Sequence, residues 1–277
     1  MNDPALSSTC CPATGARLSL WPGRAVYSGP SLELDLHSGS VTCLAIGTDA
    51  DFTLETADGT RRTGRSALIR PRVPHRIEAH GRRMTFRYVE PGSAAERACV
   101  AALGAGTEPV TVSADGAVDA MRLVRLCAQP DRSERPDTLD PRIRKAVRRL
   151  LWEPELQDGA REFAAAAGLS ASRFLHLFRE QTGTSFRRYR LWARMLRAGR
   201  ALLVHGTLTE AAAAAGFASP SHFSSSFHAT FGLRPSRLLT ARCVIVDETA
   251  AAAGHRATAA EGAPRARRAA QEDQARG

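Results

Sequence analysis

Two stretches of the chain repeat one another 49 residues apart. Residues 162–183 read EFAAAAGLSASRFLHLFREQTG, and residues 208–232 read LTEAAAAAGFASPSHFSSSFHATFG. Two phenylalanines and a closing glycine are equivalent in them: Phe174 with Phe223, Phe178 with Phe227, and Gly183 with Gly232. A repeat of this kind predicts that one supersecondary unit is built twice.

Each copy is predicted to fold as helix, tight turn and helix. In the first copy we expect Asp158 to cap a helix that runs through Ala167, and Gly168 to end it. Ser170 then caps a second helix, which runs to Gln181 and stops at the glycine that follows. Two short helices around a turn that contains glycine form a helix-turn-helix.

The second copy carries the same signals in a stronger form. Thr207 and Glu210 form a T-x-x-E capping box, the alanine run 211–215 favours helix, and Gly216 stops it. Ser219 is the next predicted N-cap, and it is followed by proline at the first helical position, where the fixed backbone angle suits a helix start.

The phenylalanine pairs divide each second helix into two faces. Phe174 and Phe178 lie four residues apart and therefore on one face, which we expect to be buried. The opposite faces carry Ser172, Arg173, His176 and Arg179 in the first copy, and Ser221, His222, Ser224 and Ser225 in the second. Short polar side chains of this kind suit the donors and acceptors that base edges display in the major groove of DNA.

A long helix is predicted between the copies, from Ser185 to Val204, and another from Pro141 to about Trp152. The linking helix carries Arg187, Arg188, Arg190, Arg194, Arg197 and Arg200. A rigid link fixes the two copies relative to each other. If they lie about 34 Å apart, which is one turn of duplex, both can enter successive major grooves.

Positive charge is concentrated around the repeat. Residues 1–130 carry 14 Arg and Lys against 13 Asp and Glu, whereas residues 141–246 carry 17 against 6. A localised basic block is typical of a protein that binds nucleic acid. A general basic drift in composition would have raised the charge along the whole chain.

Residues 17–128 are predicted to hold a small β-barrel or sandwich followed by helices. Leu32–Leu36 and Phe52–Thr56 alternate with period two, residues 41–46 are an apolar run, and Ala57–Thr60 reads as a hairpin turn. Helices are expected at 93–104 and 116–128. Residues 1–16 and 247–277 are expected to be disordered, and 129–140 to be a polar linker.

Several function classes find no support in the sequence. It has no run of 18 apolar residues and no secretory signal pattern at its N-terminus. Six cysteines without zinc-ligand spacing fit a reduced cytoplasmic compartment, with a redox pair at Cys10 and Cys11 as the weaker alternative. No nucleophile–base set, phosphate-binding loop or dinucleotide fingerprint occurs, so we expect no catalytic residue, metal or cofactor.

The repeat and its surroundings resemble the AraC/XylS family of bacterial transcription regulators. The resemblance spans about residues 141–240 and is carried by AAAAGLSASRFLHLFREQTG, RMLRAGRALL and AAAAGFASPSHFSSSFHATFGLRPS. It implies an α+β protein of two domains. Residues 17–128 would form a small cupin-like β-barrel with trailing helices, and 141–246 an all-α domain with two helix-turn-helix motifs joined by a long helix.

The same resemblance implies partners and residue roles. The partners would be promoter DNA and RNA polymerase, with activation the usual outcome, in the cytoplasm at the nucleoid. Base contacts would come from Ser172, Arg173, His176, Ser221, His222 and Ser225, and phosphate contacts from Arg179, Arg187, Arg188, Arg194 and Ser224, although the arginines at 187, 188 and 194 suit structure equally. Leu238 and Leu239 depart from the aromatic residue and arginine that the family usually shows there, which leaves a phosphate contact by the last helix in doubt.

The resemblance also implies that the first domain senses a small molecule or forms a homodimer. The helix at 116–128 could serve a dimer or an internal core. The stretch from Arg65 to Ile77 is similar to the strand-turn-His-strand of a cupin-like sensor, but the single His75 is not a metal-ligand set. Arg70, Arg72 and His75 are candidates for binding an anionic effector, against the simpler interpretation of a solvated arginine face and a turn histidine.

Two other functions compete with DNA binding. One is an enzyme on the cupin-like domain with an accessory DNA-binding domain, which lacks a ligand set. The other is a protein–protein scaffold, which the basic block argues against, because charge is depleted in the core of protein interfaces.

Overall fold

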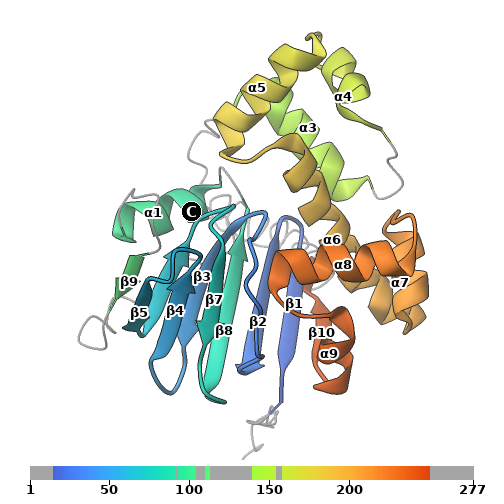
Figure 1. Cartoon of the computed structure of the whole chain (residues 1–277). Helices are drawn as coiled ribbons and strands as arrows, with labels where there is room; N and C mark the ends of the chain where they lie inside the picture. The colour runs from blue at the N-terminus through green and yellow to red at the C-terminus, as the bar shows by residue number, and fades with distance from the viewer. Residues whose placement is uncertain (1–14, 91–92, 104–109, 113–138, 154–157, 250–277) are drawn as a thin grey trace, which may run out of the picture.

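The computed structural model describes residues 15–90, 93–103, 110–112, 139–153 and 158–249. Two β-sheets come from the first part of the chain and a set of helices from the second, as Figure 1 shows. The predicted helix at 116–128, most of the linker 129–140, residues 1–14 and the tail beyond 249 lie outside the described residues.

The larger sheet has seven strands in the order β10-β1-β2-β8-β3-β6-β9. The bounds are β1 Arg17–Trp21, β2 Arg24–Pro30, β3 Thr42–Gly47, β6 Ser66–Ile69, β8 Arg83–Val89, β9 Val110–Val112 and β10 Val244–Asp247. All neighbours are antiparallel except β1 and β10, which run parallel. The smaller sheet is antiparallel, in the order β5 (Arg61–Gly64), β4 (Phe52–Thr56) and β7 (His75–Glu78).

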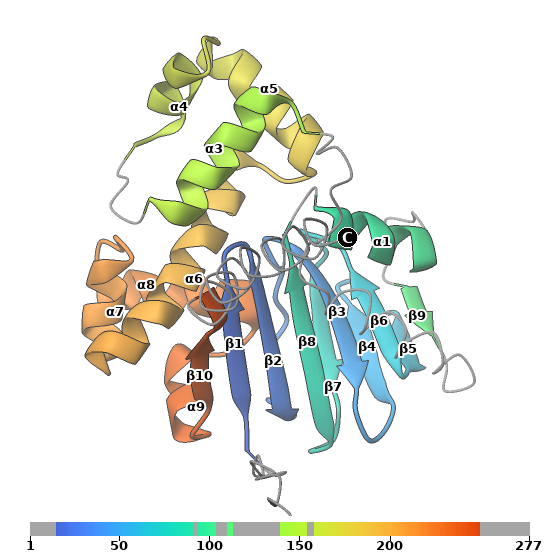
Figure 2. The same ribbon diagram turned by 180° about the vertical axis from the view of Figure 1, so that it is seen from behind.

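The two sheets bury an apolar core between them. On β4 the alternation predicted from the sequence places Phe52 and Leu54 in this core, with Phe86 of β8 and Ile77 of β7 in the same cluster. Figures 1 and 2 show the smaller sheet against one face of the larger. No pairing among the described strands closes them into a barrel, because beyond β7 only an isolated bridge to His37 continues the small sheet. Of the barrel and the sandwich expected for this region, the described strands form the open two-sheet sandwich, so the cupin-like barrel is corrected.

The helices confirm both copies of the predicted motif. Their bounds are α1 Ala94–Leu103, α3 Pro141–Trp152, α4 Ala160–Ala166, α5 Ala171–Thr182, α6 Phe186–His205, α7 Leu208–Ala214, α8 Pro220–Phe231 and α9 Pro235–Thr240. Helices α4 and α5 are the first helix-turn-helix, α7 and α8 the second, and α6 links them. The side chains of Ser170, Thr207 and Ser219 each accept a backbone N–H at the start of their helix, as predicted.

Two local predictions are wrong. Leu32–Leu36 is not a strand, because its backbone pairs with the end of α8 instead: Asp35 N–H donates to the carbonyl of Gly232 at 2.8 Å. Asp158 does not cap α4. The N-cap is Gly159, whose N–H donates to Glu162 at 2.9 Å, while Asp158 pairs with Arg149 at 2.7 Å.

The second helix-turn-helix and part of α6 share one apolar core with the sheets. Trp192 of α6 is buried, and its indole N–H donates to the carbonyl of Gly23 at 3.2 Å. Tyr189, one turn earlier, donates its hydroxyl to Glu90 at 2.8 Å. After α9 the chain returns to the large sheet as β10 beside β1. The sheet domain and the second helix-turn-helix are therefore held together by packing, hydrogen bonds and a shared sheet.

Candidate nucleic-acid interface

Helices α5 and α8, the second helix of each copy, lie on the same face of the molecule. In Figure 1, α5 lies in front of α3 and α8 in front of α6, and Figure 2 shows the same elements from behind. Left-handed glycines end both helices, Gly183 at φ 70° and Gly232 at φ 73°. The repeat in the sequence thus becomes a repeat in space, with two equivalent helices presented together.

The inner face of each helix is apolar, as predicted. Phe174 and Phe178 of α5 are fully buried, and Phe223 of α8 is 2% exposed. Phe227 is only half-buried, and its ring lies 4.6 Å from that of Phe231. Because these rings fix the rotation of each helix, the opposite residues must face outward.

The outer faces carry the side chains that the sequence singled out for DNA. All but one are exposed, namely Ser172, Arg173, His176 and Arg179 on α5 and Ser221, His222 and Ser225 on α8. Ser224 is half-buried. His222 lies edge-on to the Phe217 ring at 5.5 Å, which limits its freedom, while His176 is 3.9 Å from Glu180.

Leu175, which the sequence did not single out, is 41% exposed on the outer side of α5. It lies three residues after Ser172 and four before Arg179, and therefore beside them on the helix. This spacing was readable from the sequence. A leucine in an amphipathic helix is ordinarily assigned to the core, so its residue type pointed inward.

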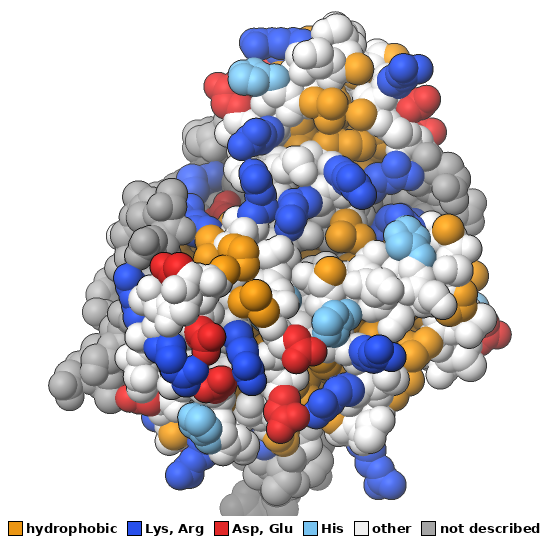
Figure 3. Space-filling model, in the orientation of Figure 1, with side chains coloured by type: hydrophobic (Ala, Val, Ile, Leu, Met, Phe, Trp, Pro, Cys, Tyr) orange, Lys and Arg blue, Asp and Glu red, His pale blue; other side chains and the backbone are white. Residues whose placement is uncertain are grey.

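Arginines gather between the two helices. Figure 3 shows Lys and Arg side chains in a band across this face, between α5 above and α8 and the sheets below. Arg187 at the start of α6 is exposed, and Arg188 is half-buried, with one guanidinium nitrogen 3.4 Å from the carbonyl of Gly39.

Arg194, in contrast, is committed to the protein. Its guanidinium donates to the carbonyls of Ala215, at 3.0 Å, and Gly216, which end α7, and it stacks 3.9 Å from the centre of the Phe217 ring. These contacts tie α6 to the turn of the second copy. Of the two roles that the sequence left open for this residue, the geometry favours the structural one.

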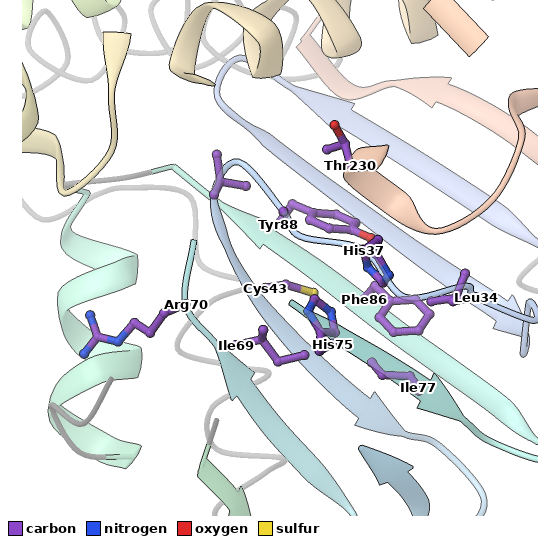
Figure 4. A pocket seen from close by; sticks show the side chains of 12 residues that line it. Leu34, His37, Cys43, Ile69, Arg70, His75, Ile77, Phe86, Tyr88 and Thr230 are labelled. Carbon is purple, nitrogen blue, oxygen red and sulfur yellow. The ribbon is translucent and has the colours of Figure 1, made fainter. Parts of the chain in front are cut away.

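The three candidate effector residues do not converge. His75 is buried in a cavity of about 10 Å³, room for about one water molecule. Its ring centre lies 4.2 Å from that of His37, and its Nδ1 is 2.9 Å from the carbonyl of Val73. Figure 4 shows Arg70 directed away from this cavity. Arg72 is exposed.

The cavity keeps its ionisable groups neutral. Burial, with the neighbouring His37 ring, lowers the pKa of His75 to about 3. Burial also lowers the pKa of His37 and raises that of the Cys43 thiol to about 12. The two histidines of the cavity therefore offer an anion no positive charge near neutral pH.

The described residues contain neither a metal-binding group nor a membrane-spanning helix. They hold no group of three or more His, Cys, Asp or Glu side chains arranged for a metal ion. No helix within them has the length and apolarity to cross a membrane.

Comparisons with known proteins agree with the geometry. Residues 163–241 match the family model described as "Helix-turn-helix domain". No curated protein matches the chain. Similar solved structures include an apo ToxT variant from Vibrio cholerae strain SCE256, which is 12% identical and aligns over 80% of this chain and 98% of that one, at a TM-score of 0.49.

Another is the DNA-binding domain of AdpA, a global transcriptional factor in complex with a target DNA. It is 28% identical over 37% of this chain and 92% of that one, at a TM-score of 0.33. The assignment depends on the family match and the repeated motif, and not on these distant likenesses. Residues 163–241 therefore form a helix-turn-helix domain of the AraC type.

Proposed function

We propose that the protein regulates transcription by binding a specific DNA sequence with α5 and α8 in successive major grooves. One observation carries this proposal: two equivalent helices lie on one face of the molecule. Their outer side chains are exposed, and basic side chains lie between them. A protein–protein scaffold would not need this charge, and the sequence contains no nucleophile–base motif that would favour catalysis.

Sequence preference would come from the outer faces of the two helices. On α5, Arg173 can hold guanine, His176 and Ser172 can exchange hydrogen bonds with base edges, and Leu175 can contact a thymine methyl group. On α8, Ser221, His222 and Ser225 would act in the same way on a second block of bases.

Affinity would come from phosphate contacts. Arg179, Arg187 and Arg188 are the arginines that suit this role, with Ser224 as a neutral donor. Each phosphate neutralised by arginine releases counterions, so binding should weaken steeply with salt.

The sheet domain would act as the input. Residues 35–38 donate two backbone hydrogen bonds to the end of α8, from Asp35 to Gly232 and from Ser38 to Ala229. A small molecule or a second copy that shifts this segment would therefore shift α8 on DNA, and so alter promoter binding and contact with RNA polymerase. An effector that used His75 would first have to enlarge its cavity.

In vitro selection from random DNA with the purified full chain tests the proposal. We expect a site with two short conserved blocks about ten base pairs apart. His176→Ala should relax the first block only and Ser221→Ala the second only, each by about 1–3 kcal/mol of discrimination. Arg148→Gln on α3, an exposed arginine outside α5 and α8, serves as the control.

Recovered DNA without a shared sequence would contradict the proposal, because charge alone would then drive binding. If both variants left both blocks unchanged, the reading residues would lie elsewhere on the two helices.

A further inference from the structure

The turn between β6 and β7 meets the start of α6 at a single carbonyl group. Arg72 in this turn donates its backbone N–H to the carbonyl of Gly39 at 3.0 Å, and the side chain of Arg188 donates to the same oxygen at 3.4 Å. Beside them, the hydroxyl of Thr184 donates to the carbonyl of Ser40 at 3.2 Å. Backbone carbonyl groups of residues 39 and 40 thus hold the two domains together at this point. Arg72 and Arg188 are therefore kept close to each other.

Three positive groups are held together at this point. Burial lowers the pKa of Arg188, and so do the charges of Arg72 and Arg187, which face it. Within the described part of the chain, none of the three pairs with a carboxylate. Like charges at short range are unfavourable, and an oxyanion between them would turn that repulsion into attraction.

The backbone of Arg72 is itself unusual. Its φ of 72° lies in the left-handed region, which glycine and asparagine adopt readily and arginine does not. A turn chosen only for its shape would be easier to build with glycine. An arginine at a strained position is a reason to look for a role of its side chain.

The cluster opens onto the face that carries α5 and α8. Arg72 and Arg187 are both exposed, and Arg187 lies four residues after Gly183, the glycine that ends α5. Figure 3 shows basic side chains in a band between α5 and the sheets. An open site suits a polymer that lies across the surface better than a small molecule that must be enclosed.

We propose that Arg72, together with Arg187 and Arg188, binds one phosphodiester of the DNA that α5 reads. The sheet domain is then part of the DNA-binding surface and not only an input to it. This inference rests on the proposed function and adds a contact from outside the helix-turn-helix domain.

The test compares DNA affinity of full-length variants across salt concentrations. Arg72→Asn removes the charge and suits the left-handed backbone, so the variant should fold. We expect it to weaken binding to all sequences alike and to reduce the slope of log affinity against log salt by about 0.9. The loss of DNA affinity relative to the wild type should be roughly three- to fourfold larger at 50 mM salt than at 200 mM salt.

Two variants make the result specific. Arg72→Lys keeps the charge and should retain most of the slope. Arg82→Asn removes an exposed arginine at the β7–β8 turn of the same domain, and should leave the slope unchanged. An Arg72→Asn slope equal to that of the wild type would overturn the inference, while wild-type binding to the selected site would leave the proposed function standing.

A second arm separates DNA from a free anion. The melting temperature of the full chain is measured with inorganic phosphate and no DNA. Stabilisation that Arg72→Asn abolishes, with an unchanged DNA slope, would overturn the inference and assign the cluster to a small anion. A wild-type chain that binds no DNA at any salt would remove the proposed function as well.

Discussion

The two helix-turn-helix copies are alike in sequence but differ in what they pack against. The first copy, α4 and α5, has its own core with α3 and the start of α6, in which Phe163, Phe174, Phe178 and Phe186 stack at 5.0–6.3 Å. The second copy, α7 and α8, shares its core with the sheets, since Phe223 and Phe231 join the cluster of Phe52 and Phe86.

This difference suggests how a signal would reach DNA. A change in the sheet domain would be felt first by α8, whose C-terminal end is bound by residues 35–38. It would reach α5 at the turn into α6, where the Thr184 hydroxyl donates to the carbonyl of Ser40. His228 of α8 also pairs with Asp35 at 2.9 Å. We infer that the first copy is the constant reader and the second the adjustable one.

The largest expected effect comes from truncating one buried phenylalanine in the core of each copy. Phe174→Ala and Phe223→Ala should each destabilise the protein by about 3–5 kcal/mol, because both rings are buried. Hydrogen exchange should show the first loss confined to α3, α4 and α5, and the second reaching β1, β2 and β8. Equal loss of protection throughout the chain in both variants would show that the two copies are not separate units.

The two C-cap glycines give a second, smaller contrast. An added Cβ at Gly183 meets nothing within 4 Å, whereas at Gly232 it would lie 2.6 Å from the Asp35 oxygen and from Nδ1 of His37. Both substitutions by alanine bear the left-handed penalty of about 1–2 kcal/mol. Gly232→Ala should cost roughly 1–3 kcal/mol more, because the sheet domain must move.

Urea unfolding at one pH measures both glycine variants. Equal losses of unfolding free energy in the two variants would mean that residues 35–38 can move at little cost. These residues would then hold α8 only weakly.

These contrasts also show what could be predicted from the sequence. Caps, turns and the two faces of α5 and α8 are local, and the sequence predicted them because Ser170, Ser219 and the closing glycines act on their own helices. Leu32–Leu36 alternates like a strand, and its misassignment has a long-range cause: Leu34 is buried while the backbone of Asp35 pairs with α8, some 197 residues away in the chain.

Other features also depended on distant partners. Nothing in Val244–Asp247 indicates that this segment will pair with β1. Nothing around Arg194 indicates that its guanidinium will donate to the carbonyl groups at the end of α7. The candidate base-reading residues were predictable because they follow from helical spacing. The arginine cluster at Arg72 was not, because it forms only where two domains meet.

Acid should weaken the packing of the second copy against the sheets more than it weakens the packing of the first copy. The pKa of His75 is lowered to about 3, so the folded state excludes a proton that the unfolded state binds below about pH 6.5. Stability is therefore full above that pH and falls as the pH drops toward 3, by up to about 1.4 kcal/mol per pH unit. Thermal unfolding between pH 7 and 5 measures this slope.

Matched histidine variants locate the effect. His75→Asn keeps a side-chain N–H for the Val73 carbonyl but does not titrate, so most of the slope should vanish. His176→Asn, on the exposed face of α5, should leave it unchanged. An unchanged slope in His75→Asn would assign the acid sensitivity to other groups.

The smallest effect should be the same in both copies. Ser170→Ala and Ser219→Ala each remove an N-cap that accepts a backbone N–H, at 3.2 Å from Arg173 and 3.1 Å from His222, and each should cost about 1 kcal/mol. A cap acts on the first turn of its own helix. Urea unfolding that gave equal losses here, beside unequal losses for the two glycines, would place the difference between the copies in their docking and not in their helices. A much larger loss for Ser219→Ala would instead mean that α8 depends on the sheets along its whole length.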